Sequence, residues 1–161
     1  MRVKFIKDED FVNFKNPCMF VGTISCTFKC CKDANISCEI CQNFPWSKNP
    51  IITIDDDSLC RRYLTNPITK GIVFGGLEPL DQFEDVMDVI SKLREDYKCL
   101  DPIIIYTGYN KDEVKDKIER LVNYENIYVK FGRYVPNQQE HYDEVLGVKL
   151  VSDNQYGEKI S

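Results

Sequence analysis

Short, continuously apolar runs that alternate with helical patterns are the feature of this sequence that most constrains its fold. The runs cover residues 19–24, 71–74, 102–107 and 127–131. Strands whose neighbouring residues are all apolar are typical of parallel sheets, because such sheets are buried on both faces. The alternation of these runs with helices therefore predicts an α/β fold in which βα units build a parallel sheet.

Three helices are expected after these runs, and each starts at a polar capping residue. The caps are residues 55–57, the capping-box pair Asp81 and Glu84, and the pair Asn110 and Glu113. The first helix carries Leu59, Tyr63 and Leu64 on one face. A further short strand is expected at residues 51–54.

The composition limits the classes of function. With 26 acidic and 21 basic side chains the net charge is −5, so no basic surface is available for the phosphates of a nucleic acid, and we expect no such partner. No apolar run approaches membrane-spanning length, and we expect no membrane association and a cytoplasmic protein. At 161 residues without repeats or flexible linkers, the chain is expected to form one domain over residues 1–161.

Five of the eight cysteines lie within residues 26–43, a segment called the cysteine loop below. In a reducing compartment, clustered cysteines indicate metal or redox chemistry, and two adjacent cysteines are a poor disulfide framework. Three residues separate Cys26 from Cys30, whereas two separate Cys38 from Cys41. Spacing alone leaves an iron–sulfur cluster, a zinc site and an inert buried cluster open.

Glycines or cysteines directly follow three of the predicted strands, at residues 25–41, 75–79 and 107–109. The carboxyl ends of parallel strands share one edge of a sheet, and ligands bind at that edge. We therefore expect the cysteine loop and the glycine-rich segments to meet at one rim.

Short motifs in these segments and in the tail match those of a known superfamily. The motifs are Cys26-Thr-Phe-Lys-Cys30, Cys41-Gln-Asn43, Gly75-Gly-Leu-Glu-Pro-Leu80, Tyr106-Thr-Gly-Tyr109 and Ser152-Asp-Asn154-Gln155. Together they resemble the radical S-adenosylmethionine enzymes, and within these the activating proteins of anaerobic ribonucleoside-triphosphate reductase. The resemblance spans most of the chain and implies a shortened, laterally open (β/α) partial barrel.

The resemblance also implies a chemistry. In enzymes of this kind three cysteines hold a 4Fe-4S cluster and leave one iron free for the amino and carboxylate groups of S-adenosylmethionine. One electron from the reduced cluster cleaves the cofactor to methionine and a 5′-deoxyadenosyl radical, which removes an α-hydrogen from a glycine of the reductase large subunit. A glycyl radical remains there. A low-potential donor such as flavodoxin is expected to supply the electron, and the reductase glycine loop is expected to enter through the open side.

The site residues follow from the same resemblance, position by position. The cluster ligands are expected to be Cys26, Cys30 and Cys41. The residues expected to face the cofactor are Asn43, Gly75, Gly76, Glu78, Tyr106, Thr107 and Gly108. The family spacing C-x3-C-x2-C is lengthened here, so the middle ligand is Cys30, which keeps the first spacing and is favoured, or Cys38, which keeps the second. The extra Leu77 leaves the role of Glu78 open.

Two other functions remain open from the sequence. The first is a different radical enzyme that modifies another peptide or a small heterocycle. The second is a zinc-binding module without catalysis, with Cys26, Cys30 or Cys31, Cys38 and Cys41 as its ligands. The only histidine, His141, lies in a polar run and is expected at the surface.

Overall fold

A computed structural model describes residues 1–161, and its centre is a six-stranded sheet. The strands of this sheet are β2 (Phe5–Asp10), β3 (Cys18–Gly22), β5 (Ile72–Gly75), β6 (Ile103–Tyr106), β7 (Ile127–Phe131) and β10 (Tyr156–Lys159). They lie in the order β10-β7-β6-β5-β3-β2. Two short antiparallel pairs lie outside it, β1 (Arg2–Val3) with β4 (Ile52–Thr53) and β8 (His141–Asp143) with β9 (Val148–Leu150).

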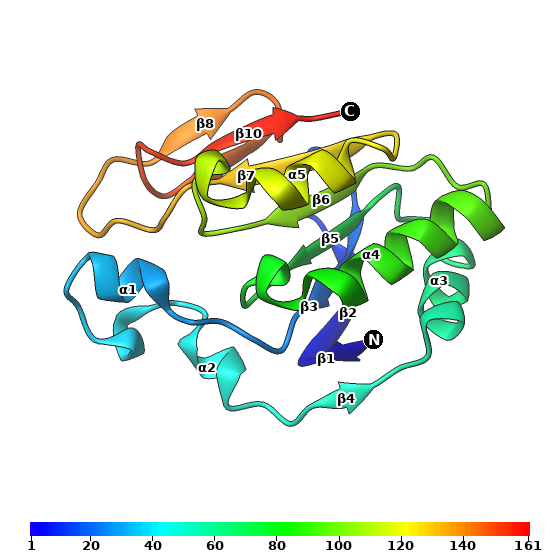
Figure 1. Cartoon of the computed structure of the whole chain (residues 1–161), viewed down its shortest axis with the longest axis horizontal. Helices are drawn as coiled ribbons and strands as arrows, with labels where there is room; N and C mark the ends of the chain where they lie inside the picture. Colours follow the sequence, from blue (N-terminus) through cyan, green and yellow to red (C-terminus); the bar gives the residue numbers. More distant parts are fainter.

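The helices occupy two places relative to the sheet. The α-helices are α1 (Lys29–Asp33), α2 (Phe44–Ser47), α3 (Asp56–Leu64), α4 (Phe83–Ser91) and α5 (Lys115–Leu121). Short 3₁₀ segments are η1 (Cys38–Ile40), η2 (Pro79–Gln82) and η4 (Lys111–Val114), and η3 (Lys92–Asp96) is a π-helical turn. Figure 1 shows α3, α4 and α5 over one face of the sheet, and α1 and α2 beyond the carboxyl ends of the central strands.

The four central strands are parallel, as predicted, but the two edge strands are not. Strands β3, β5, β6 and β7 pair in parallel, with Val21 opposite Phe74 and Phe74 opposite Ile105. Strands β2 and β10 pair antiparallel with their neighbours, so the expectation of an all-parallel sheet is wrong at both edges. Both edge strands carry charged residues, and antiparallel strands tolerate water on one face. The fold is α/β with a mixed, open sheet and no closed barrel.

The two faces of the sheet are covered unequally. On one face Phe74 and Ile105 belong to a core of 23 buried residues that includes the apolar faces of α3, α4 and α5. On the other face Val73 and Ile104 belong to a core of only seven, closed by side chains such as Leu146. The alternation of side chains along each strand separates the two cores. The thinner second face leaves room for a site near the carboxyl ends of its strands.

Two of the three predicted helix starts are confirmed. A side-chain oxygen of Asp55 accepts a hydrogen bond from the Ser58 N–H at 3.0 Å at the start of α3. Asn110 and Glu113 form the reciprocal capping box at η4. Such bonds satisfy backbone N–H groups that have no partner in the first helical turn.

The capping box predicted for Asp81 and Glu84 does not form. Glu78 instead caps η2, by accepting the Leu80 N–H at 3.0 Å. The carboxylate of Asp81 accepts hydrogen bonds from the Thr27 N–H at 3.1 Å and from the Tyr109 hydroxyl at 2.7 Å. Asp81 therefore makes tertiary contacts instead of a local cap. These contacts join the cysteine loop, through Thr27, to the segments that follow β5 and β6.

Two smaller expectations are also corrected. The strand expected at residues 51–54 forms as β4 but lies outside the central sheet, paired with β1. Leu64 is the last residue of α3 and is exposed, whereas Leu59 and Tyr63 are buried as expected. None of the helices combines the length and the apolarity that crossing a membrane would require.

Candidate functional site

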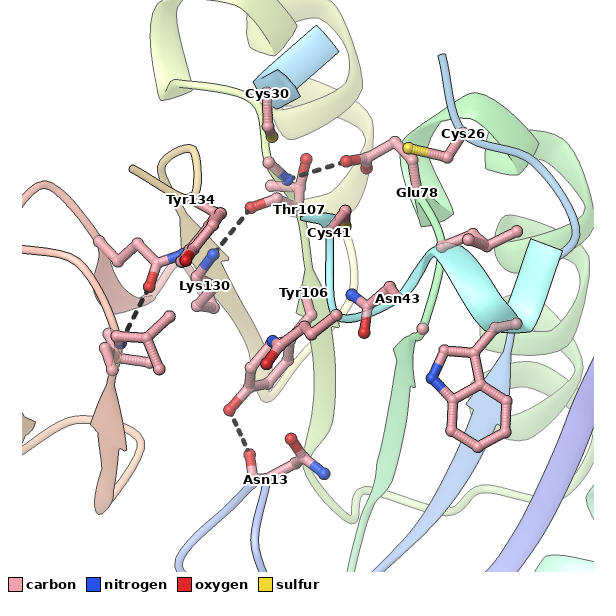
Figure 2. Close-up of a pocket in the computed structure, with 18 of the residues that line it drawn as sticks. Asn13, Cys26, Cys30, Cys41, Asn43, Glu78, Tyr106, Thr107, Lys130 and Tyr134 are labelled. Carbon is pink, nitrogen blue, oxygen red and sulfur yellow. Dashed lines mark hydrogen bonds between the residues drawn. The ribbon is translucent and has the colours of Figure 1, made fainter. Parts of the chain in front are cut away.

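A cavity of about 790 Å³ lies at the carboxyl ends of the parallel strands, on the less covered face of the sheet. Its walls come from the cysteine loop, from the loop after β5, from the ends of β6 and β7, and from the tail at Gln155. Figure 2 shows how side chains from these segments point into the same space. The three segments expected at one rim thus meet around one cavity, which has the size typical of a small-molecule site.

Nine of the ten predicted site residues line this cavity. They are Cys26, Cys30, Cys41, Asn43, Gly76, Glu78, Tyr106, Thr107 and Gly108. The tenth, Gly75, ends β5 and lies behind the cavity wall, where a Cβ would come within 3.0 Å of the Phe20 ring. Its carbonyl accepts hydrogen bonds from the N–H and the hydroxyl of Thr23, at 2.9 and 3.2 Å. Gly75 therefore joins two strand ends and does not face the cavity.

The cavity-lining thiols are Cys26, Cys30, Cys31 and Cys41, whereas Cys38 does not line the cavity. Burial raises the pKa of Cys26 to about 12. Burial also raises the pKa of Cys30, although the Tyr134 N–H and the Lys130 ammonium oppose this. Thiols with raised pKa values stay protonated near neutral pH, so these cysteines are poor free nucleophiles, and a metal would have to displace the proton to bind them.

The arrangement of the thiols distinguishes a single ion from a cluster. No three Cys, His, Asp or Glu side chains converge closely enough to hold one metal ion. A structural zinc site needs four donors around one ion, and the cysteine loop does not present that geometry. In a 4Fe-4S cluster each cysteine binds a different iron, so the ligands are spread around the cube. Cys26, Cys30 and Cys41 all line the cavity, as the three ligands of such a cluster would.

Glu78 places a carboxyl group in the cavity wall although its side chain is almost fully buried, at 6% exposed. Its two oxygens accept the Leu80 N–H at 3.0 Å and the Gly108 N–H at 2.8 Å. Burial raises the pKa of Glu78 to about 7, because the two N–H groups compensate only in part for lost hydration. The extra Leu77 is itself buried, and it does not prevent Glu78 from reaching the cavity.

Lys130 brings an ammonium group to the cavity from the end of β7 and is only 7% exposed. It donates hydrogen bonds to the backbone carbonyls of Gly132 and Thr107, at 2.9 and 3.4 Å, and forms no ion pair. Burial lowers the pKa of Lys130 to about 8, while Cys30 and Glu78 oppose this. A buried cation without a counterion is costly, so this side of the cavity is suited to an anionic group of a ligand.

Two glycines are required by close contacts at the cavity. A Cβ on Gly108 would lie 2.6 Å from the Sγ of Cys30, far inside van der Waals contact. Gly76 has a φ of +80°, a left-handed conformation that other residues rarely adopt. These glycines let the backbone of the sheet rim approach the cysteine loop and the cavity directly.

Aromatic side chains form the outer walls. The Tyr106 hydroxyl donates to the Asn13 carbonyl at 2.7 Å, which joins the end of β6 to the segment after β2 (Figure 2). Trp46 packs on Phe5 with ring centroids 4.4 Å apart, and both line the cavity. Rings in these positions exclude water from one side of the site.

The tail motif supports the rim opposite the cysteine loop. Ser152 is fully buried and its hydroxyl exchanges hydrogen bonds with the backbone of Val135, while Asn154 donates to the Arg133 carbonyl at 3.1 Å. Gln155 lines the cavity and donates to the Gly132 carbonyl at 3.4 Å. The motif therefore fixes the chain that follows β7, and one of its side chains reaches the site.

Sequence reasoning missed Lys130 and Tyr134, which both line the cavity. The signal for Lys130 was present, because it is the only charged residue in the apolar run at residues 127–131. A charge within a buried strand indicates either a partner or a site. Tyr134 carried no such signal, since it follows the strand in an irregular segment.

A family model described as a 4Fe-4S single cluster domain matches residues 21–155 of the chain. The match covers the end of β3, the cysteine loop, strands β5, β6 and β7 and the tail motif, and the chain therefore belongs to this family of iron–sulfur proteins. The family is associated with radical S-adenosylmethionine proteins. No curated protein and no solved structure matches the chain.

Proposed function

We propose that the protein is a radical S-adenosylmethionine enzyme that installs a glycyl radical on the large subunit of anaerobic ribonucleoside-triphosphate reductase. The observation that carries the proposal is the cavity at the sheet rim, which is lined by four thiols, the three expected ligands among them, and by an unpaired ammonium and a buried carboxyl group. The family match supports the cluster, and the motifs that resemble the activating proteins support the reaction.

The proposed roles of the residues follow from their chemistry. Cys26, Cys30 and Cys41 hold the cluster, and Cys38 is set aside as middle ligand because it does not line the cavity. When bound, the cluster supplies one electron that splits S-adenosylmethionine into methionine and a 5′-deoxyadenosyl radical able to remove a hydrogen atom. Cys31 also lines the cavity, but it is left out of the ligand set because a fourth thiolate would close the iron that the cofactor needs.

The charges at the cavity match the amino-acid end of this cofactor. Lys130 attracts its carboxylate, because the ammonium has no other anionic partner. Glu78 lies beside Cys26 on the other side of Thr107 (Figure 2), where it would accept a hydrogen bond from the α-amino group. A cationic side chain on one wall and a carboxyl group on the other would orient the amino-acid end of the cofactor in one direction.

The partners in this proposal follow from the openness of the fold. In this proposal the open sheet is a shortened relative of the (β/α) barrel, and the glycine loop of the reductase enters through the uncovered side. A low-potential donor such as flavodoxin supplies the electron. The protein acts as a single domain in the cytoplasm.

Metal analysis and cofactor cleavage test the proposal. Protein purified without oxygen is expected to contain iron and sulfide in equal amounts and no stoichiometric zinc. After reduction it should release 5′-deoxyadenosine from S-adenosylmethionine, and adding the reductase large subunit should produce a glycyl radical in its electron paramagnetic resonance spectrum. A protein that contains zinc but no sulfide would contradict the proposal that it is a radical enzyme. Release of 5′-deoxyadenosine without formation of a glycyl radical would indicate another substrate.

Serine variants locate the ligands. We expect Cys26→Ser, Cys30→Ser and Cys41→Ser each to lose most of their iron, while Cys38→Ser and the distant Cys99→Ser keep it. Lys130→Met should retain iron but bind S-adenosylmethionine about tenfold more weakly, the effect of losing one charged contact. If Cys30→Ser keeps the iron content of the wild type while Cys38→Ser loses iron, the middle ligand is Cys38 and not Cys30.

A further inference from the structure

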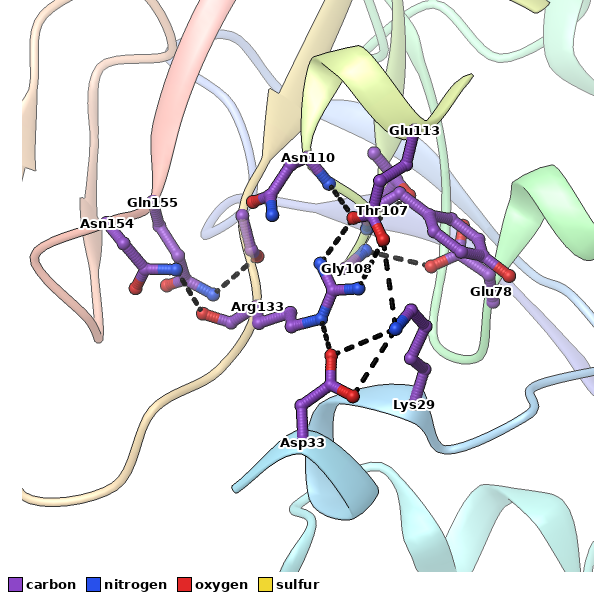
Figure 3. Close-up of polar contacts among 12 residues, drawn as sticks. Lys29, Asp33, Glu78, Thr107, Gly108, Asn110, Glu113, Arg133, Asn154 and Gln155 are labelled. Carbon is purple, nitrogen blue, oxygen red and sulfur yellow. Dashed lines mark hydrogen bonds and ion pairs between the residues drawn. The ribbon is translucent and has the colours of Figure 1, made fainter. Parts of the chain in front are cut away.

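Arg133 links the cysteine loop to the body of the protein. Its guanidinium donates two hydrogen bonds to the carboxylate of Glu113 on η4, at 2.5 and 2.6 Å. A third donor, Nε, contacts the carboxylate of Asp33 on α1. Figure 3 shows the guanidinium between the two carboxylates. The three residues come from α1, η4 and the chain after β7, segments that are far apart in sequence.

Lys29 completes this group, which we call the latch: Lys29, Asp33, Glu113 and Arg133. The Lys29 ammonium lies 3.1 Å from Asp33 and 3.8 Å from Glu113. Two cations therefore alternate with two carboxylates, and each carboxylate faces both cations (Figure 3). Networks of this kind are more stabilising than isolated surface pairs.

Within the latch, the Arg133–Glu113 pair is better shielded from water than the other arginine pairs of the chain, whereas Lys29 and Asp33 are 43% and 42% exposed. The Arg133 side chain is 11% exposed and that of Glu113 is 27% exposed. In the comparable pair of Arg62 with Asp8, both side chains are close to half exposed, at 46% and 45%. Charge pairs interact more strongly where water is partly excluded, and the pKa of Glu113 is accordingly lowered to about 2 by Arg133.

Besides the latch, the cysteine loop is attached to the body of the protein by the bond from the Thr27 N–H to Asp81 and by the Tyr134 N–H, which contacts the Cys30 thiol. The backbone–backbone hydrogen bonds of residues 28–46 all stay within residues 28–49. Helix α1 has only five residues and follows Phe28, which has a φ of 53° and gives no side-chain cap. A short helix without a cap and without backbone bonds to the sheet depends on side-chain contacts for its position.

We propose that Arg133 is a positioning residue, which through Asp33 holds α1 and the Cys30 thiol against the sheet rim in the geometry that the cluster requires. Residue 133 lies one position beyond Gly132, which the tail motif holds through Gln155. The latch therefore ties the ligand-bearing loop to the best-supported part of the rim. The inference rests on the proposed cluster ligands and not on the identity of the substrate.

Asp33→Asn is the most informative variant, because the exposed Asp33 side chain contributes little to the core. We expect hydrogen exchange of residues 28–43 in the cluster-free protein to become about threefold faster, the size expected for losing one ion pair. The unfolding midpoint should stay within a degree or so of the wild type. Arg133→Met should give the same acceleration, and Arg133→Lys should restore part of the protection.

A second measurement follows the cluster itself. In reconstituted protein, Asp33→Asn and Arg133→Met should lose iron to a chelator several-fold faster than the wild type and show a changed electron paramagnetic resonance line shape after reduction. Arg62→Met is the matched control, since it removes an arginine–carboxylate pair far from the loop, and it should match the wild type in both assays.

The outcomes separate the latch from the proposed function. Unchanged exchange and unchanged iron loss in Asp33→Asn would overturn the latch, even in an enzyme that cleaves S-adenosylmethionine. Faster exchange of residues 28–43 in Asp33→Asn alone would support it, because this measurement needs neither cluster nor cofactor. Wild-type protein without iron and sulfide would instead overturn the proposed function.

Discussion

At Gly108 the missing side chain leaves room for the Cys30 thiol, because a Cβ there would lie 2.6 Å from Cys30 Sγ. At Lys130 the reverse holds, since a long charged side chain lies at a position that pairs with Tyr106 on β6 and Gly157 on β10. The motif containing Gly108 could be identified from the sequence. The reason for the glycine could not, because it depends on a thiol 78 positions earlier in the chain.

Gly108→Ala should impair cluster binding more than folding. The added methyl group must displace Cys30, so we expect the iron content after anaerobic reconstitution to fall several-fold. Gly71→Ala is a matched control, because its Cβ would meet the Cys18 thiol at 2.9 Å, away from the cavity. Gly71→Ala should lower the unfolding midpoint but keep its iron. Equal iron loss in both variants would show that the effect is only on folding.

Among the helices and strands, local sequence patterns predicted the starts of α3 and η4 correctly, but they did not predict that the edge strands pair antiparallel. Helix α3 begins where Asp55 predicts, and the Asn110–Glu113 capping box forms, because these bonds involve residues three positions apart. The Asp81–Glu84 box has the same spacing but does not form, since Asp81 is used by Thr27 and Tyr109. A cap can be predicted only where no tertiary partner competes for it.

Asp55→Ala should destabilise the fold without affecting the site. The variant removes the acceptor for the Ser58 N–H at the start of α3, which costs about 1 kcal/mol. For a chain of this length that corresponds to a fall of roughly 2–4 °C in the unfolding midpoint. Glu119→Ala on α5 is the control, because its side chain makes no hydrogen bond. An unchanged midpoint in Asp55→Ala would mean that α3 is held by packing alone.

At the scale of the whole molecule, the carboxylates of ion pairs couple stability to pH. The pKa values of Asp8, Asp33 and Glu84 are lowered by their arginine or lysine partners, and that of Glu113 is lowered to about 2. A carboxylate with a depressed pKa in the folded state binds fewer protons than in the unfolded chain. Its contribution is complete above its ordinary pKa and is lost as the pH falls toward the folded value.

Glu113→Gln should therefore reduce the loss of folding stability that acid causes in the wild type. Between about pH 4.5, the ordinary value of the carboxyl group, and about pH 2, the wild type loses the contribution of Glu113. Glutamine keeps an acceptor for the Asn110 N–H but has no charge to lose. Denaturant unfolding at several pH values checks this: the variant should be less stable near pH 7 and converge with the wild type near pH 2. Parallel profiles would contradict the prediction.

Apolar periodicity and capping residues are enough to predict the four buried strands, the three longer helices and the rim at which cysteines and glycines meet. These features depend on local spacing and on the rule that parallel strands end at one edge. The antiparallel edge strands, the lack of a counterion at Lys130 and the contact of Arg133 with Asp33, 100 positions away, are visible only in the folded chain. Such contacts form between segments whose mutual position is set by the packing of the whole chain, and no local pattern records it.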